Sequence, residues 1–302
     1  MADVTDIYAN HRIRGLGLVS ASFAVWALHY ANIKWLAADY SVWQLLFVRS
    51  VFALIILVCI SRRHGTEALA ASANKLSLGL RGLLFFASTL CFYTASRSLG
   101  LAEVTTLYAI APVLIVVLAI PMLGEKIGGA HWLAVAIGLV GTIIAADPSG
   151  RISAVPSLLA LGSAVLWAFG AILTRRIALS ESTANQMLAT NITFVLFAAF
   201  SLPWVWETPD PIGFMLMLAL GIEVCLGQYF FYEGYRYAPA SLLAPMEYTS
   251  VAWSCVLGFL IFSDIPALNV VLGALLVVGS GVSLVALERH RAKHAFFPHQ
   301  SQ

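Results

Sequence analysis

The sequence predicts an all-α integral membrane protein with ten transmembrane helices, built as two inverted five-helix repeats. Three observations lead to this fold class. Of the 302 residues, 60% are hydrophobic and 11% are charged, and the mean hydropathy is +0.88, whereas a soluble domain is about half apolar and a quarter charged. Ten apolar runs are each long enough to cross a bilayer, which takes roughly 20 residues. Short motifs also recur between the two halves of the chain.

The apolar runs give the predicted spans in order. The first half holds spans at 13–33, 41–61, 76–96, 102–123 and 128–146, and the second half holds spans at 154–174, 183–204, 211–232, 241–262 and 266–287. Strands are excluded as the spanning element because a membrane strand alternates its faces over about 10 residues, whereas runs such as Val113–Ile120 are apolar on every face. The two halves are the predicted domains, residues 13–146 and 154–287.

The positive charges predict the orientation, because Lys and Arg gather in cytoplasmic loops. The bias between the two sides is twelve to three when the N-terminus is placed inside, so both termini are expected in the cytoplasm. The inner segments then hold Arg12, Arg14, Arg62, Arg63, Lys75, Lys126, Arg175, Arg176, Arg236, Arg289, Arg291 and Lys293, and the outer segments hold Lys34, Arg97 and Arg151.

The internal repeat rests on matches that keep their order along the chain. Residues 92–97, FYTASR, correspond to residues 231–236, FYEGYR, at a shift of 139, and Trp26 corresponds to Trp167 at a shift of 141. Each unit has five spans, an odd number, so the second unit enters from the opposite side of the membrane. Inverted repeats are a recurrent architecture of secondary transporters, in which one site at the repeat interface faces either side in turn.

The sequence resembles the drug/metabolite transporter superfamily, EamA-like branch, over residues 13–287. Gly124-Glu125 follows span 4 in the first half. At the corresponding place after span 9, where the family pattern has a second Gly-Glu, this chain has Ser263-Asp264 and so keeps an acid. The resemblance implies a small-molecule transporter of the bacterial inner membrane, and members move amino acids, nucleosides, riboflavin, S-adenosylmethionine or metallophores. The residues that carry it are Gln44–Arg49 in span 2, Ala111-Pro112 in span 4, Leu123–Lys126 after it and Ala244–Tyr248 in span 9.

Three ionisable side chains stand out inside predicted spans, where a charge costs on the order of 3 kcal/mol on insertion scales. They are Arg49 in span 2, Glu223 in span 8 and Glu247 in span 9. Arg49 either pairs with one of the acids and holds helices in register, or anchors an anionic or carbonyl group of a substrate. In the second interpretation one glutamate is a proton site or a cation contact. We favour a structural Arg49, and a Glu247 that faces a cavity because it follows Pro245.

Pro112 and Pro245 lie inside predicted spans 4 and 9. A proline removes a helix hydrogen bond, and a water-filled cavity can satisfy the carbonyl that it frees; a harmless kink is the alternative. Aromatic and hydrogen-bonding side chains nearby suit a flat, ring-bearing solute, although simple packing is the alternative for about half of them. The predicted substrate-binding residues are Tyr93, Tyr108, Trp167, Glu223, Gln228, Tyr232, Glu247, Tyr248 and Trp253, with His29 and Asn32 as further candidates.

Two other patterns predict contacts between helices. Polar residues follow span 7 at helical spacing, and we expect them to form interhelical hydrogen bonds. Spans 5 and 10 are rich in small residues such as Gly138 and Gly279, so they are expected to be scaffold or the contact of a homodimer. The polar residues of span 7 are Asn185, Gln186, Thr190 and Asn191.

Function is therefore predicted to be secondary transport, with riboflavin uptake as the leading specific hypothesis and export of amino acids or related metabolites as the alternative. An intramembrane enzyme acting on lipid would need nucleophiles, bases or metal ligands clustered at one depth, and the sequence shows none. A scaffold or signalling protein would not need mid-membrane charges and paired prolines. The chain lacks a phosphate-binding loop, and its net charge of +2 suggests no nucleic-acid partner. No metal or cofactor is expected.

Overall fold

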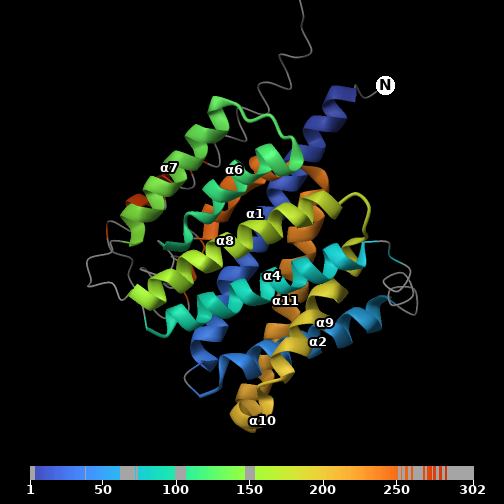
Figure 1. Cartoon of the computed structure of the whole chain (residues 1–302). Coiled ribbons are helices and arrows are strands. Elements are labelled where there is room, and N and C mark those ends of the chain that lie inside the picture. Colours follow the sequence, from blue (N-terminus) through green and yellow to red (C-terminus); the bar gives the residue numbers. More distant parts are fainter. Residues whose placement is uncertain are drawn as a thin grey trace, which may run out of the picture.

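A computed structural model describes most of the chain and shows helices as the only regular elements in that part (Figure 1). Most of predicted span 10, most of the second half of span 9 and the start of span 4 lie outside it. The residues described are 4–37, 39–61, 72, 74–98, 107–146, 154–250, 253, 256, 257, 260, 268, 271–273, 275, 276, 279, 280 and 283.

The observed helices follow the predicted spans closely, which confirms the all-helical fold. The main differences are a longer first helix and a division of span 7 into two helices. The elements are α1 (Val4–Leu36), α2 (Val42–Ser61), α4 (Lys75–Ser96), α6 (Ala111–Leu123), α7 (Gly129–Ala146), α8 (Ala154–Ile177), α9 (Thr183–Ala199), α10 (Leu202–Val205), α11 (Pro211–Tyr237), α12 (Ala240–Leu243) and the 3-10 helix η1 (Ala244–Tyr248).

Five of the described helices, α1, α2, α4, α8 and α11, contain stretches long and apolar enough to cross a membrane. The others are shorter: α6 has 13 residues and α9 has 17. Large apolar side chains also point outward, and Ile60, Leu158 and Phe200 are 76%, 68% and 78% exposed. A soluble monomer rarely exposes large contiguous apolar surface, whereas lipid covers such a surface in a membrane.

Local sequence signals explain where several helices begin and end. Ser182 caps α9 by accepting the backbone N–H of Asn185 at 3.1 Å, and Asp210 caps α11 by accepting that of Gly213 at 2.8 Å. A short polar side chain at this position satisfies an N–H group that has no partner within the helix. Helix α6 ends at Gly124, whose φ of +67° lies in the left-handed region that favours glycine.

Glu125, directly after α6, caps a helix in the other half of the chain. Its carboxylate accepts the backbone N–H groups of Ala240 and Ser241, both at 2.9 Å, and the Ser241 hydroxyl at 2.5 Å. These are the first N–H groups of α12, which leads directly into η1. The Gly-Glu motif after α6 therefore fixes the start of the segment that carries Glu247.

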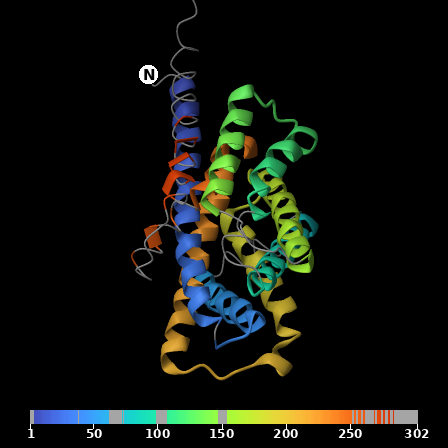
Figure 2. The same ribbon diagram turned by 90° about the vertical axis from the view of Figure 1, so that its left-hand side faces the viewer.

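The helices pack in pairs that draw one member from each half of the chain (Figures 1 and 2). Helix α1 lies along α11, and α4 lies along α8. Helix α2 contacts both α9 and α11, while α4 contacts α9 as well. The core of the molecule is therefore shared by the two halves.

The two prolines singled out in the sequence lie at breaks of helical structure. Pro112 occupies the first turn of α6, after a turn at residues 109–110, so it does not interrupt the interior of a helix. Pro121 is the residue that lies inside α6. Pro245 lies in the 3-10 segment η1, between α12 and helical residues 249–250. A 3-10 stretch within a span often marks a hinge or a strained sequence.

Candidate functional site

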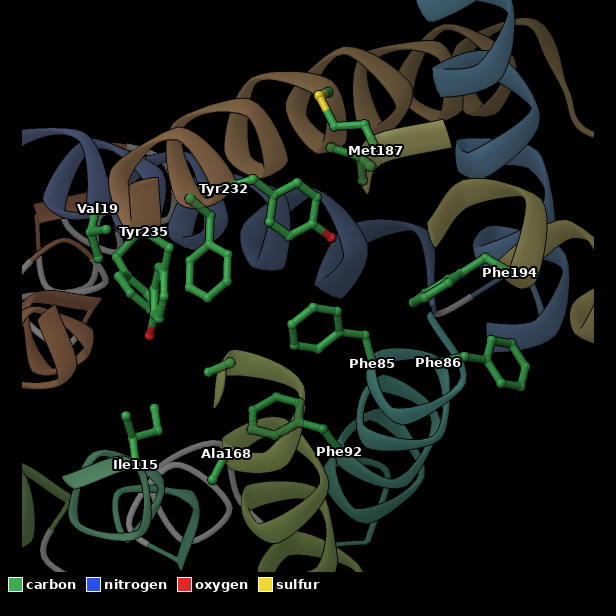
Figure 3. Close-up of a cluster of buried hydrophobic side chains, with 14 of the residues drawn as sticks. Val19, Phe85, Phe86, Phe92, Ile115, Ala168, Met187, Phe194, Tyr232 and Tyr235 are labelled. Atoms are coloured by element: carbon green, nitrogen blue, oxygen red, sulfur yellow. The ribbon is translucent and has the colours of Figure 1, made fainter. Parts of the chain in front are cut away.

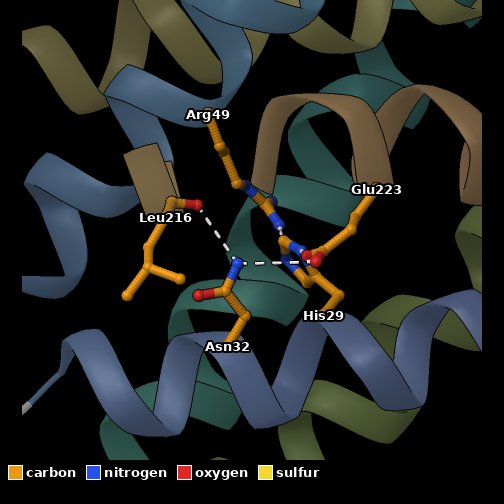
Figure 4. Close-up of polar contacts among 5 residues, drawn as sticks. All are labelled: His29, Asn32, Arg49, Leu216 and Glu223. Carbon is orange, nitrogen blue, oxygen red and sulfur yellow. Dashed lines mark hydrogen bonds and ion pairs between the residues drawn. The ribbon is translucent and has the colours of Figure 1, made fainter. Parts of the chain in front are cut away.

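A buried chain of polar side chains connects α2, α1 and α11 (Figure 4). Arg49 Nη1 lies 2.7 Å from His29 Nε2, and His29 Nδ1 lies 3.2 Å from Glu223 Oε2. Asn32 donates from Nδ2 to Glu223 Oε1 at 3.4 Å and to the carbonyl of Leu216 at 3.1 Å. Arg49, His29 and Glu223 are 2%, 0% and 9% exposed.

Hydrogen-bond chemistry fixes the protonation state of His29 in this chain. A guanidinium only donates hydrogen bonds, so His29 Nε2 must be the acceptor from Arg49 and carries no proton. The proton of the ring is then on Nδ1, where it donates to the Glu223 carboxylate. Arg49 therefore reaches Glu223 through a neutral histidine, and the three side chains together are electrically neutral.

A second buried arginine, Arg81, connects α4 to α9 without any acidic partner among the described residues. It donates from Nη1 to Gln186 Oε1 at 2.6 Å, and from Nη2 to the Gln186 carbonyl at 2.5 Å and to Thr190 Oγ1 at 2.8 Å. Its guanidinium carbon lies 4.4 Å from the ring centroid of Tyr232, and the Tyr232 hydroxyl is 3.0 Å from Thr190 Oγ1. These neutral partners hold the Arg81 charge in place.

Glu247, on η1, is the second buried acid. Trp167 Nε1, from α8, donates to both of its carboxylate oxygens, at 3.0 Å to Oε1 and 3.1 Å to Oε2. Glu247 is 4% exposed, and the Trp167 indole is its only side-chain hydrogen-bond donor in the described part of the chain. Trp167 in turn packs against Tyr108, with 6.4 Å between the ring centroids.

Aromatic rings form a buried cluster that includes Trp167, and part of this cluster is drawn in Figure 3. The rings of Phe85 and Trp167 are 4.9 Å apart between centroids, and those of Trp167 and Phe231 are 5.4 Å apart. Figure 3 shows rings from α4 and α11 facing one another beside α8. The Tyr108 ring also lies close to Trp167, at 6.4 Å, and to Phe92, at 5.3 Å, measured between ring centroids. The charged groups therefore border one continuous aromatic cluster.

The buried polar groups and the aromatic cluster that they border together form one buried layer. Several buried polar atoms of this layer lack a hydrogen-bond partner within the described residues. Such orphans are rare in native proteins and usually indicate water or a ligand. Their placement beside the charged groups marks this layer as the candidate site. They include Arg49 Nε, Trp26 Nε1, Asn32 Oδ1, Asn191 Oδ1 and Tyr235 Oη.

Comparison with known proteins decides the family. The sequence profile of the EamA-like transporter family matches residues 13–146 and again residues 155–286. The chain belongs to the EamA-like transporter family. The resemblance seen in the sequence is thus confirmed, and this EamA-like protein is a multi-pass membrane transporter rather than an enzyme.

Individual relatives of this EamA-like transporter have low sequence identity to it. It is 23% identical to an S-adenosylmethionine uptake transporter of Rickettsia felis, over 92% of this chain and 94% of the relative. It is 27% identical to a riboflavin transporter of Brucella anthropi, over 79% and 86%, and 25% identical to a pseudopaline exporter of Pseudomonas aeruginosa, over 90% and 94%. A crystal structure with 22% identity has the same fold, with a TM-score of 0.76, over 93% of this chain and 98% of the other.

Most residues predicted for the substrate site of this EamA-like transporter lie in or beside the aromatic cluster. Glu223 joins Arg49 through His29, and Glu247 joins Trp167, with Tyr108 alongside. The other three border the same layer. The ring centroids of Tyr93 and Tyr30 are 6.3 Å apart, and the Arg81 guanidinium carbon lies 4.4 Å from the Tyr232 ring centroid. Gln228 accepts a hydrogen bond from the Asn191 amide at 2.7 Å.

Two predicted residues have other surroundings. The Tyr248 hydroxyl donates to the carbonyl of Ala109 at 3.2 Å, and its ring lies directly against Gly138 of α7, where a Cβ would be 2.2 Å from Tyr248 Cδ2. Tyr248 therefore packs η1 onto α7. Trp253 is 38% exposed, and no contact between described residues joins it to the aromatic cluster.

The interhelical hydrogen bonds predicted for span 7 are confirmed, since Gln186 and Thr190 bind Arg81 and Asn191 binds Gln228. Sequence reasoning missed Arg81 itself. The signal was present, because an arginine within the span at 76–96 is an ionisable residue in the membrane interior and so a functional candidate.

Proposed function

We propose that this EamA-like transporter moves a small, ring-bearing metabolite across the bacterial inner membrane by alternating access. One observation carries the proposal: a buried layer of charges and aromatic rings is built from both halves of the chain. Arg49 and Tyr108 come from the first half, and Glu223, Glu247 and Trp167 come from the second. Charges this deep in a bundle usually face a partner or a substrate path.

The proposed architecture is ten spans in two inverted five-helix repeats, residues 13–146 and 154–287. The packing supports it, because the main contacts of α1, α2, α4, α8, α9 and α11 between the halves have counterparts with the halves exchanged. Helix α1 on α11 corresponds to α8 on α4, and α2 on α11 corresponds to α9 on α4. This exchange supports an inverted repeat, and in secondary transporters with inverted repeats the substrate site lies at the interface between the repeats. Both termini are then cytoplasmic, and a homodimer contact through spans 5 and 10 stays a prediction.

Riboflavin uptake is the first specific function to test. The supporting observations are the aromatic cluster, which suits a flat heterocycle, and the relative that is named a riboflavin transporter. Expression in a riboflavin auxotroph should restore growth on trace riboflavin and produce accumulation of labelled riboflavin, compared with an empty vector. If the tagged protein is present in the inner membrane and neither occurs, riboflavin uptake is excluded.

Export is the second candidate, because one relative is named an exporter. The substrates to test are amino acids and related metabolites. Cells that express the chain should then survive toxic amino-acid analogues at concentrations that stop control cells, and they should release preloaded labelled amino acid faster. Unchanged resistance and release would remove this candidate.

A further inference from the structure

The strongest unexplained feature of the layer is the carboxylate of Glu247. A carboxylate has about four positions at which it accepts hydrogen bonds, yet the indole of Trp167 is its only described side-chain donor. A buried charge without a counter-charge costs several kcal/mol. Glu247, which is 4% exposed, therefore needs a positive partner when it is ionised.

The two buried arginines and the half-buried Arg175 donate their hydrogen bonds to other groups. Arg49 donates to His29 at 2.7 Å, and Arg81 donates to Gln186 and Thr190. Arg175, in the last turn of α8, donates to the carbonyl of Tyr235 at 2.7 Å. None of these three guanidinium groups donates to Glu247 among the described contacts, so the positive partner is not one of them.

The rings around Glu247 form surroundings that attract a cation. Trp167 donates to the carboxylate and Tyr108 packs on Trp167. Tyr235 joins the same cluster through Phe231, and Tyr30 joins it through Phe92. The faces of such rings attract positive charge, as in the aromatic cages that bind quaternary ammonium groups. Trp167, Tyr108 and Tyr30 are only partly buried, which leaves ring surface available.

A second observation also indicates a ligand at this point. The side chain of Tyr235 is fully buried, and its hydroxyl has no hydrogen-bond partner within the described residues. The Tyr235 ring packs on Phe231 at 4.7 Å and Phe231 packs on Trp167 at 5.4 Å, measured between ring centroids, so this hydroxyl belongs to the same cluster as the donor to Glu247. A polar group of a bound solute would satisfy it.

The repeat relation shows that the acid belongs to one half only. At the shift of 139 residues, Glu247 corresponds to Tyr108, and at the shift of 141 Trp167 corresponds to Trp26. Trp167 Nε1 has an acidic acceptor, whereas Trp26 Nε1 is buried without a partner in the described chain. The layer is therefore asymmetric, with a buried acid at η1 in the second half and a tyrosine at the corresponding place in the first.

We propose that Glu247, Trp167, Tyr108, Tyr30 and Tyr235 bind a positively charged group of the transported solute. The substrate class is then a ring-bearing organic cation or zwitterion, with the ring in the aromatic cluster and the cationic group against the Glu247 carboxylate. This inference rests on the proposed function, because it assigns the same layer to the solute.

The test compares solutes that differ by one positive charge, using purified full-length protein in detergent. One pair is S-adenosylmethionine, a sulfonium, and S-adenosylhomocysteine, which keeps the same amino-acid group but has a neutral thioether sulfur. The other is 1-methylnicotinamide, a pyridinium, and 3-methylbenzamide, its neutral isostere. In at least one pair the added charge should tighten binding about tenfold by calorimetry, because a desolvated cation gains both ring and carboxylate contacts.

Glu247→Gln should reduce the affinity for the charged member to that of the neutral member. The matched control Glu207→Gln removes an exposed carboxylate and should keep the tenfold ratio. Equal or absent binding of both members in both pairs overturns the inference on wild-type protein alone, whether or not the variant folds. A ratio that survives Glu247→Gln overturns it as well.

The outcome is separable from the proposed transport function. Riboflavin uptake without any preference for positive charge would remove only the cation site. Absence of uptake or export of every solute by protein inserted in the membrane would remove the proposed function instead.

Discussion

At the scale of single residues, the structure explains how deeply buried charges persist in an apolar bundle. Arg49 and Glu223 are joined by a neutral His29 whose two ring nitrogens have opposite roles, acceptor and donor. Arg81 is held by an amide, a carbonyl, a hydroxyl and an aromatic face. Buried charges are tolerated when such hydrogen bonds satisfy them.

Replacement of His29 by phenylalanine should destabilise the protein strongly. The change fills a similar volume, but it leaves the Arg49 guanidinium and the Glu223 carboxylate without the group that connects them. Breaking a buried charged network typically costs about 3 kcal/mol or more. Thermal unfolding in detergent measures the effect, and His11→Gln, at an exposed position of α1, is the control. Equal melting temperatures for the two variants would contradict the prediction.

The surroundings of Glu181, in the connection between α8 and α9, predict that the free energy of unfolding depends on pH. Burial raises its pKa, but hydrogen bonds from Ser72, Asn185 and Asn74 outweigh this and hold the pKa below its ordinary value of 4.5. A lowered carboxylate pKa stabilises the folded state at pH values above 4.5, and this stabilisation is lost as the pH falls through the folded-state pKa.

The Glu181→Gln variant isolates that contribution. It should be less stable than the wild type at neutral pH, and the difference should shrink as the pH is lowered below 4.5. Thermal unfolding in detergent between neutral and acidic pH measures it. A difference that is constant across this range would show that ionisation of Glu181 does not contribute.

At the scale of elements, residues of the family motifs form hydrogen bonds between segments that are far apart in the chain. Glu125 caps α12. Gln44, the first residue of the motif at the start of α2, pairs its amide with the backbone of Glu207, accepting at 2.8 Å and donating at 2.5 Å. The motifs that identified the family therefore hold the loops that position η1 and α11.

Close helix packing gives the prediction at this scale. Helix α8 approaches α4 at Gly170, where a Cβ would lie 2.5 Å from Phe85 Cε1. Gly170→Ala should therefore push the Phe85 ring away from Trp167 and destabilise the protein by about 1–3 kcal/mol, as overpacking does. Gly162→Ala lies on the same helix, meets nothing within 4 Å, and should be neutral or stabilising. Thermal unfolding of both variants checks this, and equal losses would refute it.

At the scale of the whole molecule, the two halves share one interior. The pairs α1 with α11 and α4 with α8 interlock them, so neither half buries its polar residues alone. The Arg49 chain and the Glu247 group both combine residues of the two halves. A layer shared in this way is what an alternating-access mechanism requires.

The orientation of the halves is directly testable. With five spans per half, a reporter fused after Gln302 should be cytoplasmic, and one inserted between residues 146 and 154 should be periplasmic, because the positive-inside bias is twelve to three. Alkaline phosphatase and green fluorescent protein fusions report the two sides. Cytoplasmic placement of both reporters would refute the inverted arrangement.

The sequence by itself determined the class of protein, the depth of each polar residue and the membership of the family. Apolar runs near 20 residues specify a membrane helix because the bilayer core sets that length. The interhelical hydrogen bonds of span 7 and the burial of Glu223 and Glu247 could be predicted, because polar residues within an apolar run must find partners inside the bundle.

Only the tertiary structure decided which side chains meet. A linear pattern fixes depth but not the rotation of a helix or its neighbour, so nothing in the sequence placed His29 between Arg49 and Glu223, or joined Trp167 to Glu247. For the same reason the sequence could not show that Tyr248 packs on Gly138 or that Trp253 is 38% exposed. Contacts between helices depend on how the two halves interlock, and each helix acquires its polar partners only when they do.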